Sequence, residues 1–343
     1  MKTLPAPRVP DPTRAGSLGW GILGPGGIAD TFASALRAGT SQRLVAVGSR
    51  SRERATGFAE RHDIPRAYGD YEQVLADPEV DAVYVAVPAH AHLGLTLLAI
   101  EAGKHVLVEK PFARNAGEAR QMVSAARAAG VTLMEAMWSR FLPGTDVIRQ
   151  VLDAGALGEL RLVMCDHCHK VPTTGRLYDP AAAGGALLDI GVYGFAFANL
   201  ALGEPRGISA VGSLTGNGLD AQEVVTLSDF ARHPGALAVL TSSMVTASSA
   251  AASICGSSGR LDLPSEFYRP SPVTFSDSSG TRLEYVPAPD PSQGALCHEI
   301  AHFATLVAEG ATESQVMSLD ESVAIMVQLD AARALLGVSF PGE

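Results

Sequence analysis

The sequence predicts an α/β protein whose first part is a doubly wound parallel sheet. Short apolar runs alternate with helical patterns from residue 18 to residue 135, which is the order of repeated βαβ units. A glycine-rich turn follows the first of these runs. The run Val106-Leu107-Val108 is apolar at every position, as expected of a strand buried on both faces of a parallel sheet.

The elements of this first half follow in order. The first strand ends at Leu23, and a helical pattern runs through Leu36 after the glycine turn. We then expect strands over 43–48, 64–68, 81–88, 106–108 and 131–135, with helices over 71–76, 93–102 and 117–129 between them. Gly103 and Gly130 end the last two helices, since glycine is the usual residue just past a helix C-terminus.

The second half reads differently. A strand is expected over 159–169 and a helix from Ala186, and the chain beyond residue 207 is rich in Ser, Thr, Val and turn residues. Strand-like runs cover 236–242, 251–257 and 282–287, and helices cover 295–309 and 319–336. This pattern predicts an α+β region with an extended antiparallel sheet.

Composition excludes several classes of protein. The 343 residues are 47% hydrophobic, enough for two domains, and a net charge of -10 argues against nucleic-acid binding. We find no apolar run of the ~18 residues that a membrane span needs. Four cysteines give no disulfide framework, so we expect a reducing, cytoplasmic location. Residues 1–16 contain four prolines and no apolar core, and we interpret them as a flexible leader rather than a signal peptide.

The glycine turn has the spacing G-x-G-x-x-A, with Gly24, Gly26 and Ala29 followed by a helix. This spacing is typical of dinucleotide binding, because the glycines allow a tight turn and close approach of a pyrophosphate. Gly27 and Ile28 would place free N–H groups at the helix start, where phosphates bind.

The end of the second strand predicts the choice of cofactor. An NAD site usually carries an Asp or Glu there for the ribose hydroxyls. This chain has Ser49, Arg50 and Arg54 instead. An arginine guanidinium can donate two hydrogen bonds to a 2′-phosphate, whereas a carboxylate would repel it. We therefore expect NADP rather than NAD. The alternative, compatible with the first, is a solvated helix start with Ser51 as its N-cap.

Two further strand ends carry candidate groups, since ligands bind at the carboxyl ends of strands in such sheets. One strand ends at Val87 and Pro88, with His92 four residues on; the next ends in Glu109, Lys110 and Pro111. A loop histidine is also a common hydrogen-bonding group. Glu109 and Lys110 could equally form a surface ion pair before a strand-ending proline.

Candidate groups of the second half lie in two places. Asp189 and Tyr193 are four residues apart in the expected helix and so share one face; the alternative is a Tyr–Asp hydrogen bond in the core. The segment 165–169 reads Cys-Asp-His-Cys-His, a formal haem-attachment pattern that we reject, because a strand puts its two cysteines on opposite faces. Its first cysteine and both histidines share a face and could line a substrate pocket. We expect no metal site.

These motifs together resemble the Gfo/Idh/MocA oxidoreductases. The matching segments are Gly-Ile-Ala at 27–29, the Val-Pro strand end with His92, 101–111 and 184–193. The resemblance implies a Rossmann domain over 17–138 and a substrate-binding and dimerisation domain over 139–343 with a large, open, mostly antiparallel sheet. It also implies that Lys110 lies near the nicotinamide and that dimers, or dimers of dimers, form through that sheet.

Two departures narrow the resemblance. Tyr193 stands where many members have His, and Ala183 stands where a Gly is usual. At Tyr193 and in the segment 134–141, which contains Trp138 and Arg140, the sequence resembles one branch of the family. That branch contains dimeric dihydrodiol dehydrogenases and NADP-dependent D-xylose dehydrogenases. That branch uses NADP, and Trp138 and Arg140 are then candidates for cofactor contact.

The resulting hypothesis is reversible hydride transfer between the cofactor and a secondary alcohol or hemiacetal of a sugar, inositol or vicinal diol. An ordinary phenol has a pKa near ~10, so a neighbouring Lys110 ammonium would help Tyr193 act as the base. Lys110 could also be the acid or base itself, and Asp189 would orient the substrate hydroxyl or Lys110. The alternatives are a keto- or anhydro-sugar reductase and a non-catalytic NADP-binding regulator.

Overall fold

The computed structural model describes residues 2–288 and 295–343, which form two compact units. Residues 10–141 and 295–323 form the first, called here the parallel-sheet unit. Residues 2–9, 142–288 and 324–343 form the second, called here the mixed-sheet unit. Each unit is built from segments that are distant in the sequence.

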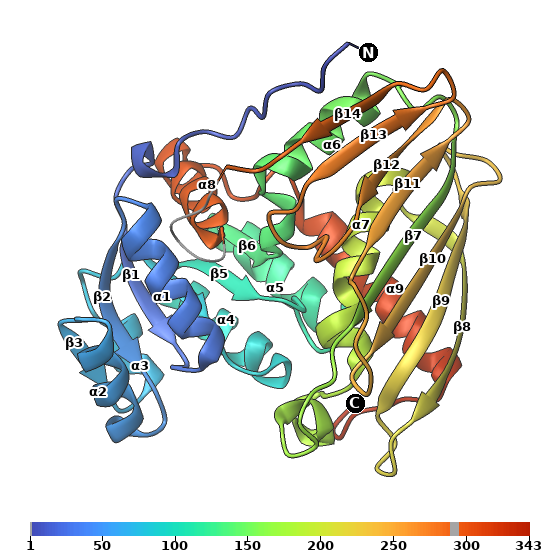
Figure 1. The fold of residues 1–343 in the computed structure, drawn as a ribbon. Coiled ribbons are helices and arrows are strands. Elements are labelled where there is room, and N and C mark those ends of the chain that lie inside the picture. The colour runs from blue at the N-terminus through green and yellow to red at the C-terminus, as the bar shows by residue number, and fades with distance from the viewer. Residues whose placement is uncertain (1, 289–294) are drawn as a thin grey trace. The chain divides into compact units, whose positions relative to one another are not determined.

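The parallel-sheet unit contains six parallel strands in the order β3-β2-β1-β4-β5-β6 (Figure 1). The strands are β1 (Gly19–Leu23), β2 (Arg43–Gly48), β3 (Arg66–Tyr68), β4 (Ala82–Val85), β5 (His105–Glu109) and β6 (Leu133–Ala136). The central strands β1 and β4 are buried at every position, as their uniformly apolar sequences require. The predicted doubly wound sheet is confirmed.

Helices accompany this sheet in the alternating order that the sequence predicts. They are α1 (Gly27–Gly39), α2 (Arg52–Arg61), α3 (Tyr71–Leu75), α4 (His92–Glu101) and α5 (Ala116–Ala129). Gly130 ends α5 in the left-handed conformation, with φ 68°, which glycine adopts without steric cost.

The parallel-sheet unit also includes α8 (Leu296–Glu309), from late in the chain. Trp20 of β1 packs against Phe32 of α1 at 5.4 Å and against Phe303 of α8 at 5.2 Å between ring centroids. Leu133 at the start of β6 donates its N–H to the Thr312 carbonyl at 3.0 Å. The unit therefore extends beyond the expected range 17–138, because these apolar contacts bring residues 295–323 back to it.

The mixed-sheet unit contains eight strands in the order β14-β13-β12-β11-β7-β10-β9-β8 (Figure 1). They are β7 (Leu160–Cys168), β8 (Pro205–Leu214), β9 (Asp220–Phe230), β10 (Leu237–Ser243), β11 (Ala252–Gly256), β12 (Gly259–Leu263), β13 (Val273–Asp277) and β14 (Arg282–Tyr285). Only the β7–β10 pair among them is parallel. The expected large, mostly antiparallel sheet is confirmed.

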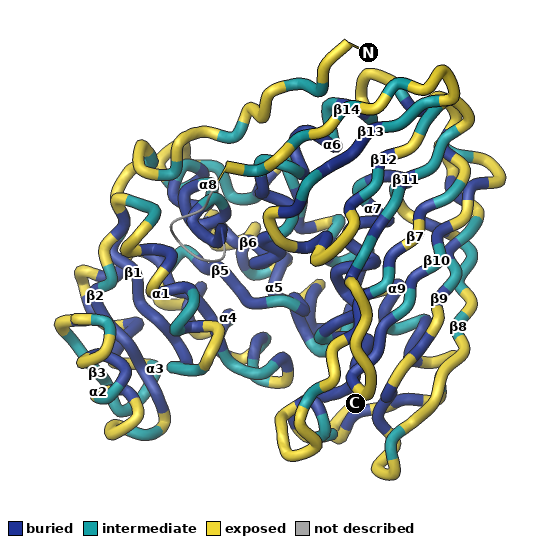
Figure 2. Tube along the Cα trace, in the orientation of Figure 1, coloured by how far each residue is buried: buried dark blue, intermediate teal, exposed yellow. Residues whose placement is uncertain are grey.

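One face of this sheet is covered and the other is open. Along β7, Val163, Cys165 and His167 are buried, whereas Met164 between them is 43% exposed. The helix α7 (Val192–Leu202) packs on β7 and is almost wholly buried. Figure 2 shows the contrast between this buried helix and the exposed strand β8. The alternation along β7 therefore separates a core face from an outer face.

Pro180–Leu202 contains a helix long and apolar enough to cross a membrane, but 89% of its most apolar window is buried, as expected of a core helix. Residues near the N-terminus, expected as a flexible leader, contact α6 (Pro143–Asp153): Arg8 donates to Asp146 and Gln150 donates to the Ala6 carbonyl.

Candidate cofactor and substrate sites

The glycine turn lies at the carboxyl end of β1 in the parallel-sheet unit. Gly24 has φ 101°, and a Cβ atom there would lie 2.7 Å from Val87 Cγ1 and 2.9 Å from the Ala86 carbonyl oxygen. Neither distance is tolerated by a real side chain. Gly24 is therefore required both by its backbone conformation and by the close approach of the end of β4.

Unlike Gly24, the glycines Gly26 and Gly27 have open space on the side where a Cβ atom would lie. A Cβ atom on Gly26 would meet only the Ala86 carbonyl oxygen, at 4.0 Å, and one on Gly27 would meet nothing within 4 Å. Helix α1 begins at Gly27 without a side-chain cap, and Ile28 is 39% exposed. An uncapped helix start with open space above it fits a phosphate group, whose oxygens accept from backbone N–H groups. The turn thus fits the pyrophosphate of a dinucleotide.

The end of β2 presents hydroxyl and guanidinium groups. Ser49 is 3% exposed, and its hydroxyl accepts the Ser51 N–H at 3.2 Å. Ser51 caps α2 by accepting the Arg54 N–H at 3.3 Å, so the N-cap interpretation of this serine is correct. Arg50 and Arg54 are exposed. Their guanidinium groups are accessible to an anionic ligand.

His92 is almost fully buried, at 1% exposure. One ring nitrogen lies 2.8 Å from the Val87 carbonyl oxygen and the other lies 3.0 Å from the Pro111 carbonyl oxygen. Carbonyl oxygens only accept, so both bonds are complete when both nitrogens carry hydrogen. His92 therefore ties the chain after β4 to the chain after β5. Val87 and Pro88 themselves are half-buried.

The end of β5 carries Glu109 and Lys110. Glu109 is 7% exposed; it accepts a hydrogen bond from the Tyr84 hydroxyl and another from the Lys110 N–H at 3.1 Å. Lys110 is half-buried, and the Lys110–Pro111 peptide bond is cis. The structure thus turns Glu109 toward the interior of the unit and leaves Lys110 at its carboxyl edge.

Two buried carboxyl groups that sequence reasoning missed belong to the same unit. Glu135 of β6 is 2% exposed and Glu299 of α8 is 1% exposed. Burial raises the pKa of Glu135 to about 7, and the nearby charges of Glu321 and Glu109 act in the same direction. Burial, with the charge of Glu109, raises the pKa of Glu299 well above its ordinary value. A glutamate within an expected buried strand was the available signal for Glu135.

Trp138 and Arg140 lie in a 3₁₀ turn, Trp138–Arg140, after β6. They are 9% and 4% exposed. The Arg140 guanidinium donates to Glu321 at 2.6 Å and to the Val316 carbonyl at 3.1 Å. Arg140 is thereby fixed inside the unit.

In the mixed-sheet unit, Asp189 and Tyr193 lie on consecutive but different helical turns. Asp189 belongs to a π-helical turn, Leu187–Gly191, and Tyr193 to the first turn of α7. Asp189 accepts from the Arg176 guanidinium at 2.6 Å, a partner that the sequence did not indicate. Tyr193 is 7% exposed. A π-turn changes the i,i+4 spacing of a regular helix and is frequent at functional sites.

The start of this helical segment is held by a buried acid. Asp220 of β9 is 1% exposed, and one of its oxygens accepts the Leu187 N–H at 2.5 Å. Gly185 has φ 113°, and a Cβ atom there would lie 2.3 Å from Asp220 Oδ1. Burial raises the pKa of Asp220 to about 6, although its backbone hydrogen bonds oppose the shift. The Gly184-Gly185 motif is therefore a close contact between helix start and sheet.

Tyr193 is surrounded by rings from two other segments of this unit. Its ring centroid lies 5.2 Å from that of His167 and 5.1 Å from that of Tyr268. His167 stacks on Tyr268 at 4.4 Å, and His169 lies 4.8 Å from His167. Of the three residues expected to share a face, His167 is the one whose ring contacts Tyr193. Cys165 and Cys168 are free, and burial raises the pKa of both thiols.

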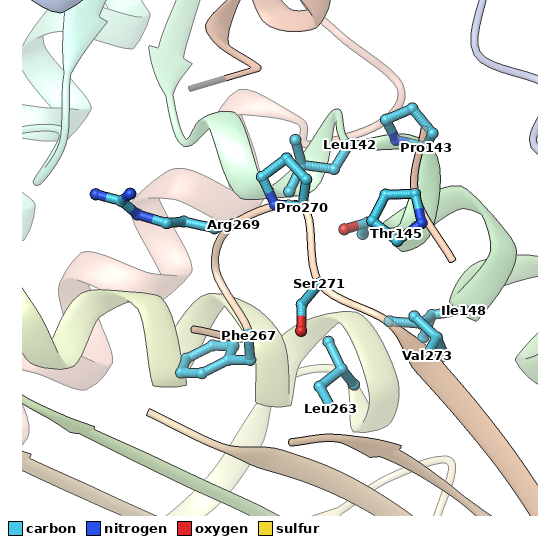
Figure 3. A pocket seen from close by; sticks show the side chains of 12 residues that line it. Leu142, Pro143, Thr145, Ile148, Leu263, Phe267, Arg269, Pro270, Ser271 and Val273 are labelled. Carbon is cyan, nitrogen blue, oxygen red and sulfur yellow. The ribbon is translucent and has the colours of Figure 1, made fainter. Parts of the chain in front are cut away.

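A separate hollow lies in the same unit (Figure 3). It is lined by Leu142, Pro143, Gly144, Thr145, Ile148, Leu263, Phe267, Arg269, Pro270, Ser271, Val273 and Pro287. Arg269 is the one ionisable group among these lining residues, and it points away from the others in Figure 3. The lining offers no base for alcohol chemistry, so we do not place the reaction there.

The glycine turn on a doubly wound sheet defines the class of nicotinamide-nucleotide-dependent oxidoreductases. A family model described as GFO/IDH/MocA, an oxidoreductase family with an NAD-binding Rossmann fold, matches residues 18–137. The model of the GFO/IDH/MocA C-terminal domain matches residues 145–262. The chain belongs to the GFO/IDH/MocA family and is an NAD(P)-dependent dehydrogenase or reductase.

Similar proteins agree with this assignment. Trans-1,2-dihydrobenzene-1,2-diol dehydrogenase from Homo sapiens is 35% identical over 338 residues, covering 95% of this chain and 99% of the relative. A solved 3-ketoreductase from Actinomadura kijaniata, in complex with NADP and TDP-benzene, is 28% identical with a TM-score of 0.79, covering 93% and 98% of the two chains. The aldose-aldose oxidoreductase from Caulobacter crescentus, complexed with glycerol, is 26% identical with a TM-score of 0.83, covering 94% and 98%.

Proposed function

We propose that this protein is an NADP-dependent dehydrogenase that oxidises a secondary alcohol or hemiacetal of a sugar, inositol or vicinal diol. One observation carries the proposal: Tyr193 is a nearly buried phenol, held beside the rings of His167 and Tyr268 on a segment anchored to the sheet. The similarity to dihydrodiol dehydrogenases over almost the whole chain supports a diol or a sugar as the substrate class.

For the cofactor, Gly26, Gly27 and Ile28 would hold the pyrophosphate, and Ser49, Arg50 and Arg54 the 2′-phosphate of NADP. A bound NADP would supply the acceptor for the hydride of the carbinol carbon. Val87, Pro88, His92 and Glu109 would shape the site around it, since His92 fixes the chain after β4 and β5. NAD is the weaker candidate because the residues directly after β2, Ser49 and Arg50, include no carboxylate.

For proton transfer, we assign Tyr193 as the acceptor of the substrate hydroxyl proton and Lys110 as a cation that favours the phenolate or itself exchanges the proton. Asp189 would orient the hydroxyl while Arg176 fixes its carboxylate. Structures of the similar 3-ketoreductase include one lysine-to-alanine and one tyrosine-to-phenylalanine variant, the residue types to which we give these roles.

The proposal is tested by NADP reduction, followed by absorbance, over a panel of sugars, inositols and vicinal diols. Tyr193→Phe and Lys110→Ala should each lower kcat/KM by about 10²-fold or more, the usual contribution of a general acid or base. Lys104→Ala is the matched control, because Lys104 precedes β5 and donates to the Asp77 and Val80 carbonyls. Full activity of both site variants would contradict the assignment.

Two alternatives use the same residues. A keto- or anhydro-sugar reductase would run the reaction in the opposite direction, and the similar 3-ketoreductase favours testing it with NADPH and keto-sugars. A non-catalytic NADP-binding regulator would bind NADPH but oxidise or reduce no member of either panel. Binding and turnover assays on one preparation separate these cases.

We also propose a homodimer, or a dimer of dimers, formed through the open face of the mixed sheet. Apolar side chains on that face are exposed: Val211 by 71%, Met164 and Leu237 by 43% each, and Val224 by 38%. Val211 pairs with Val224 across β8 and β9, so the patch is continuous there. Val211→Lys should raise the monomer fraction in light scattering; an unchanged mass would locate the interface elsewhere.

We propose that the protein is located in the cytoplasm. All four cysteines lie in the described residues and are free, which fits a reducing compartment. Fractionation of cells that produce the protein would test it.

A further inference from the structure

The contacts of His167 determine where its protons lie. Its Nδ1 atom is 2.9 Å from the Ile190 carbonyl oxygen, in the π-helical turn that precedes Tyr193. A carbonyl only accepts, so Nδ1 carries hydrogen. The Nε2 atom of His167 lies 3.0 Å from Nε2 of His169. In the neutral ring this Nε2 is an acceptor, so His169 must donate to it.

Two facing ring nitrogens at hydrogen-bonding distance hold one proton between them. His169 Nε2 also lies 3.1 Å from the Tyr268 hydroxyl, which can donate or accept. If the pair takes up a further proton at the other nitrogen of His169, the shared proton can move to His167. His167 is then a cation that donates through both nitrogens, to Ile190 and to His169.

The pair of His167 and His169 reaches solvent through His169. His169 is exposed, whereas His167 is 3% exposed. A proton captured at the surface can therefore place its charge on the buried ring. That ring lies in a T-shaped arrangement with Tyr193 at 5.2 Å and is stacked on Tyr268 at 4.4 Å between centroids. Electron-rich tyrosine faces stabilise an adjacent cation.

We propose that His167 and His169 share one exchangeable proton, and that the charge placed on His167 promotes ionisation of the Tyr193 phenol. The inference deepens the proposed function and rests on it: the pair is a positioning element for the base, and neither histidine touches the substrate in it. A cation within about 4–6 Å favours the charged form of a phenol. It does so from within the unit that carries Tyr193.

Other ionisable groups belong to the elements packed around this pair. On β7, the Cys165 and Cys168 thiols stay neutral because burial raises their pKa. Asp166 accepts the N–H groups of Ala250 and Ala251. Burial also raises the pKa of Tyr268, with opposing effects of Arg269 and Glu266 beside it. Lys170 follows β7, Asp189 is paired with Arg176, and Cys255 lies on β11.

The first experiment needs no substrate. The side-chain nitrogens of His167 and His169 are titrated by NMR in the full chain, using His169→Gln to assign the signals. Shared protonation predicts two macroscopic pKa values separated by more than about one unit, because a second proton would put two cations 3.0 Å apart. Two equal and independent titrations would overturn the inference. A stoichiometric metal ion, released by chelator with loss of the pattern, would overturn it too.

The second experiment follows Tyr193 itself. With ¹³C-labelled tyrosine and Tyr193→Phe for assignment, His167→Gln and His169→Gln should each raise the pKa of Tyr193 by on the order of one unit. The kcat/KM for alcohol oxidation near neutral pH should fall about tenfold and recover at higher pH. His233→Gln, in the same unit, is the control and should change neither quantity. A fall in rate without movement of the Tyr193 titration would refute the inference.

These two readouts also separate this inference from the proposed function. If no substrate of either panel is turned over while the two titrations behave as stated, the proposed function fails and the proton pair stands. If Tyr193→Phe abolishes turnover but neither histidine variant moves the Tyr193 titration, the function stands and the pair does not.

Discussion

Replacing Glu135 with glutamine should change how the stability of the protein depends on pH. Glu135 is 2% exposed, and neither carboxyl oxygen makes a hydrogen bond of normal geometry. The Ser322 side chain and the Phe112 backbone offset part of the cost of burial. The balance still raises the pKa of Glu135 from 4.5 to about 7.

The sign follows from proton binding. Between pH 4.5 and about 7 the folded protein holds a proton on Glu135 that the unfolded chain has released. Stability therefore falls as pH rises through this window, and the loss is complete above it. At ~1.4 kcal/mol for each pH unit, the loss reaches about 3 kcal/mol. Below pH 4.5 both states are protonated and the effect is absent.

The assay is denaturant unfolding of the wild type and Glu135→Gln at a series of pH values from 5 to 8. Because the other titrating groups are common to both proteins, their effects cancel in the difference. The variant should gain about 2–3 kcal/mol relative to the wild type over this range. Glu101→Gln, at an exposed position of α4, should give a constant difference. A constant difference for Glu135→Gln as well would refute the reasoning.

Three other changes have definite expected outcomes. Gly24→Ala should weaken NADPH binding, measured by fluorescence titration, and lower the melting temperature, since its Cβ would lie 2.7 Å from Val87 Cγ1. Arg50→Asp should lower the ratio of NADP to NAD in kcat/KM by about tenfold or more, and an unchanged ratio would mean that Arg50 does not contact the cofactor. Ala183→Gly should raise the free energy of unfolding by about 0.5–1 kcal/mol, because Ala183 has φ 55°. An equal or lower denaturation midpoint would contradict this last prediction.

Local patterns predicted the alternation of strands and helices in the parallel-sheet unit. The glycine turn, the end of β5 and the Gly184-Gly185 motif were recognisable because each requires particular residues at fixed spacing. The strands β8, β9, β12 and β13 were not assigned individually. β8 is exposed at most of its positions, so its sequence does not show the regular alternation that identifies a half-buried strand.

The sequence by itself determined the family and the dinucleotide fold and gave the candidates for acid–base chemistry, because those depend on local spacing and residue type. The tertiary structure decided which groups meet them. It brought α8 back to β1, placed Asp220 under the start of the Tyr193 segment, and gave Asp189 the partner Arg176. It also set the two ring nitrogens of His167 and His169 3.0 Å apart. Such contacts join residues far apart in the chain or depend on side-chain rotation, so no short sequence pattern encodes them.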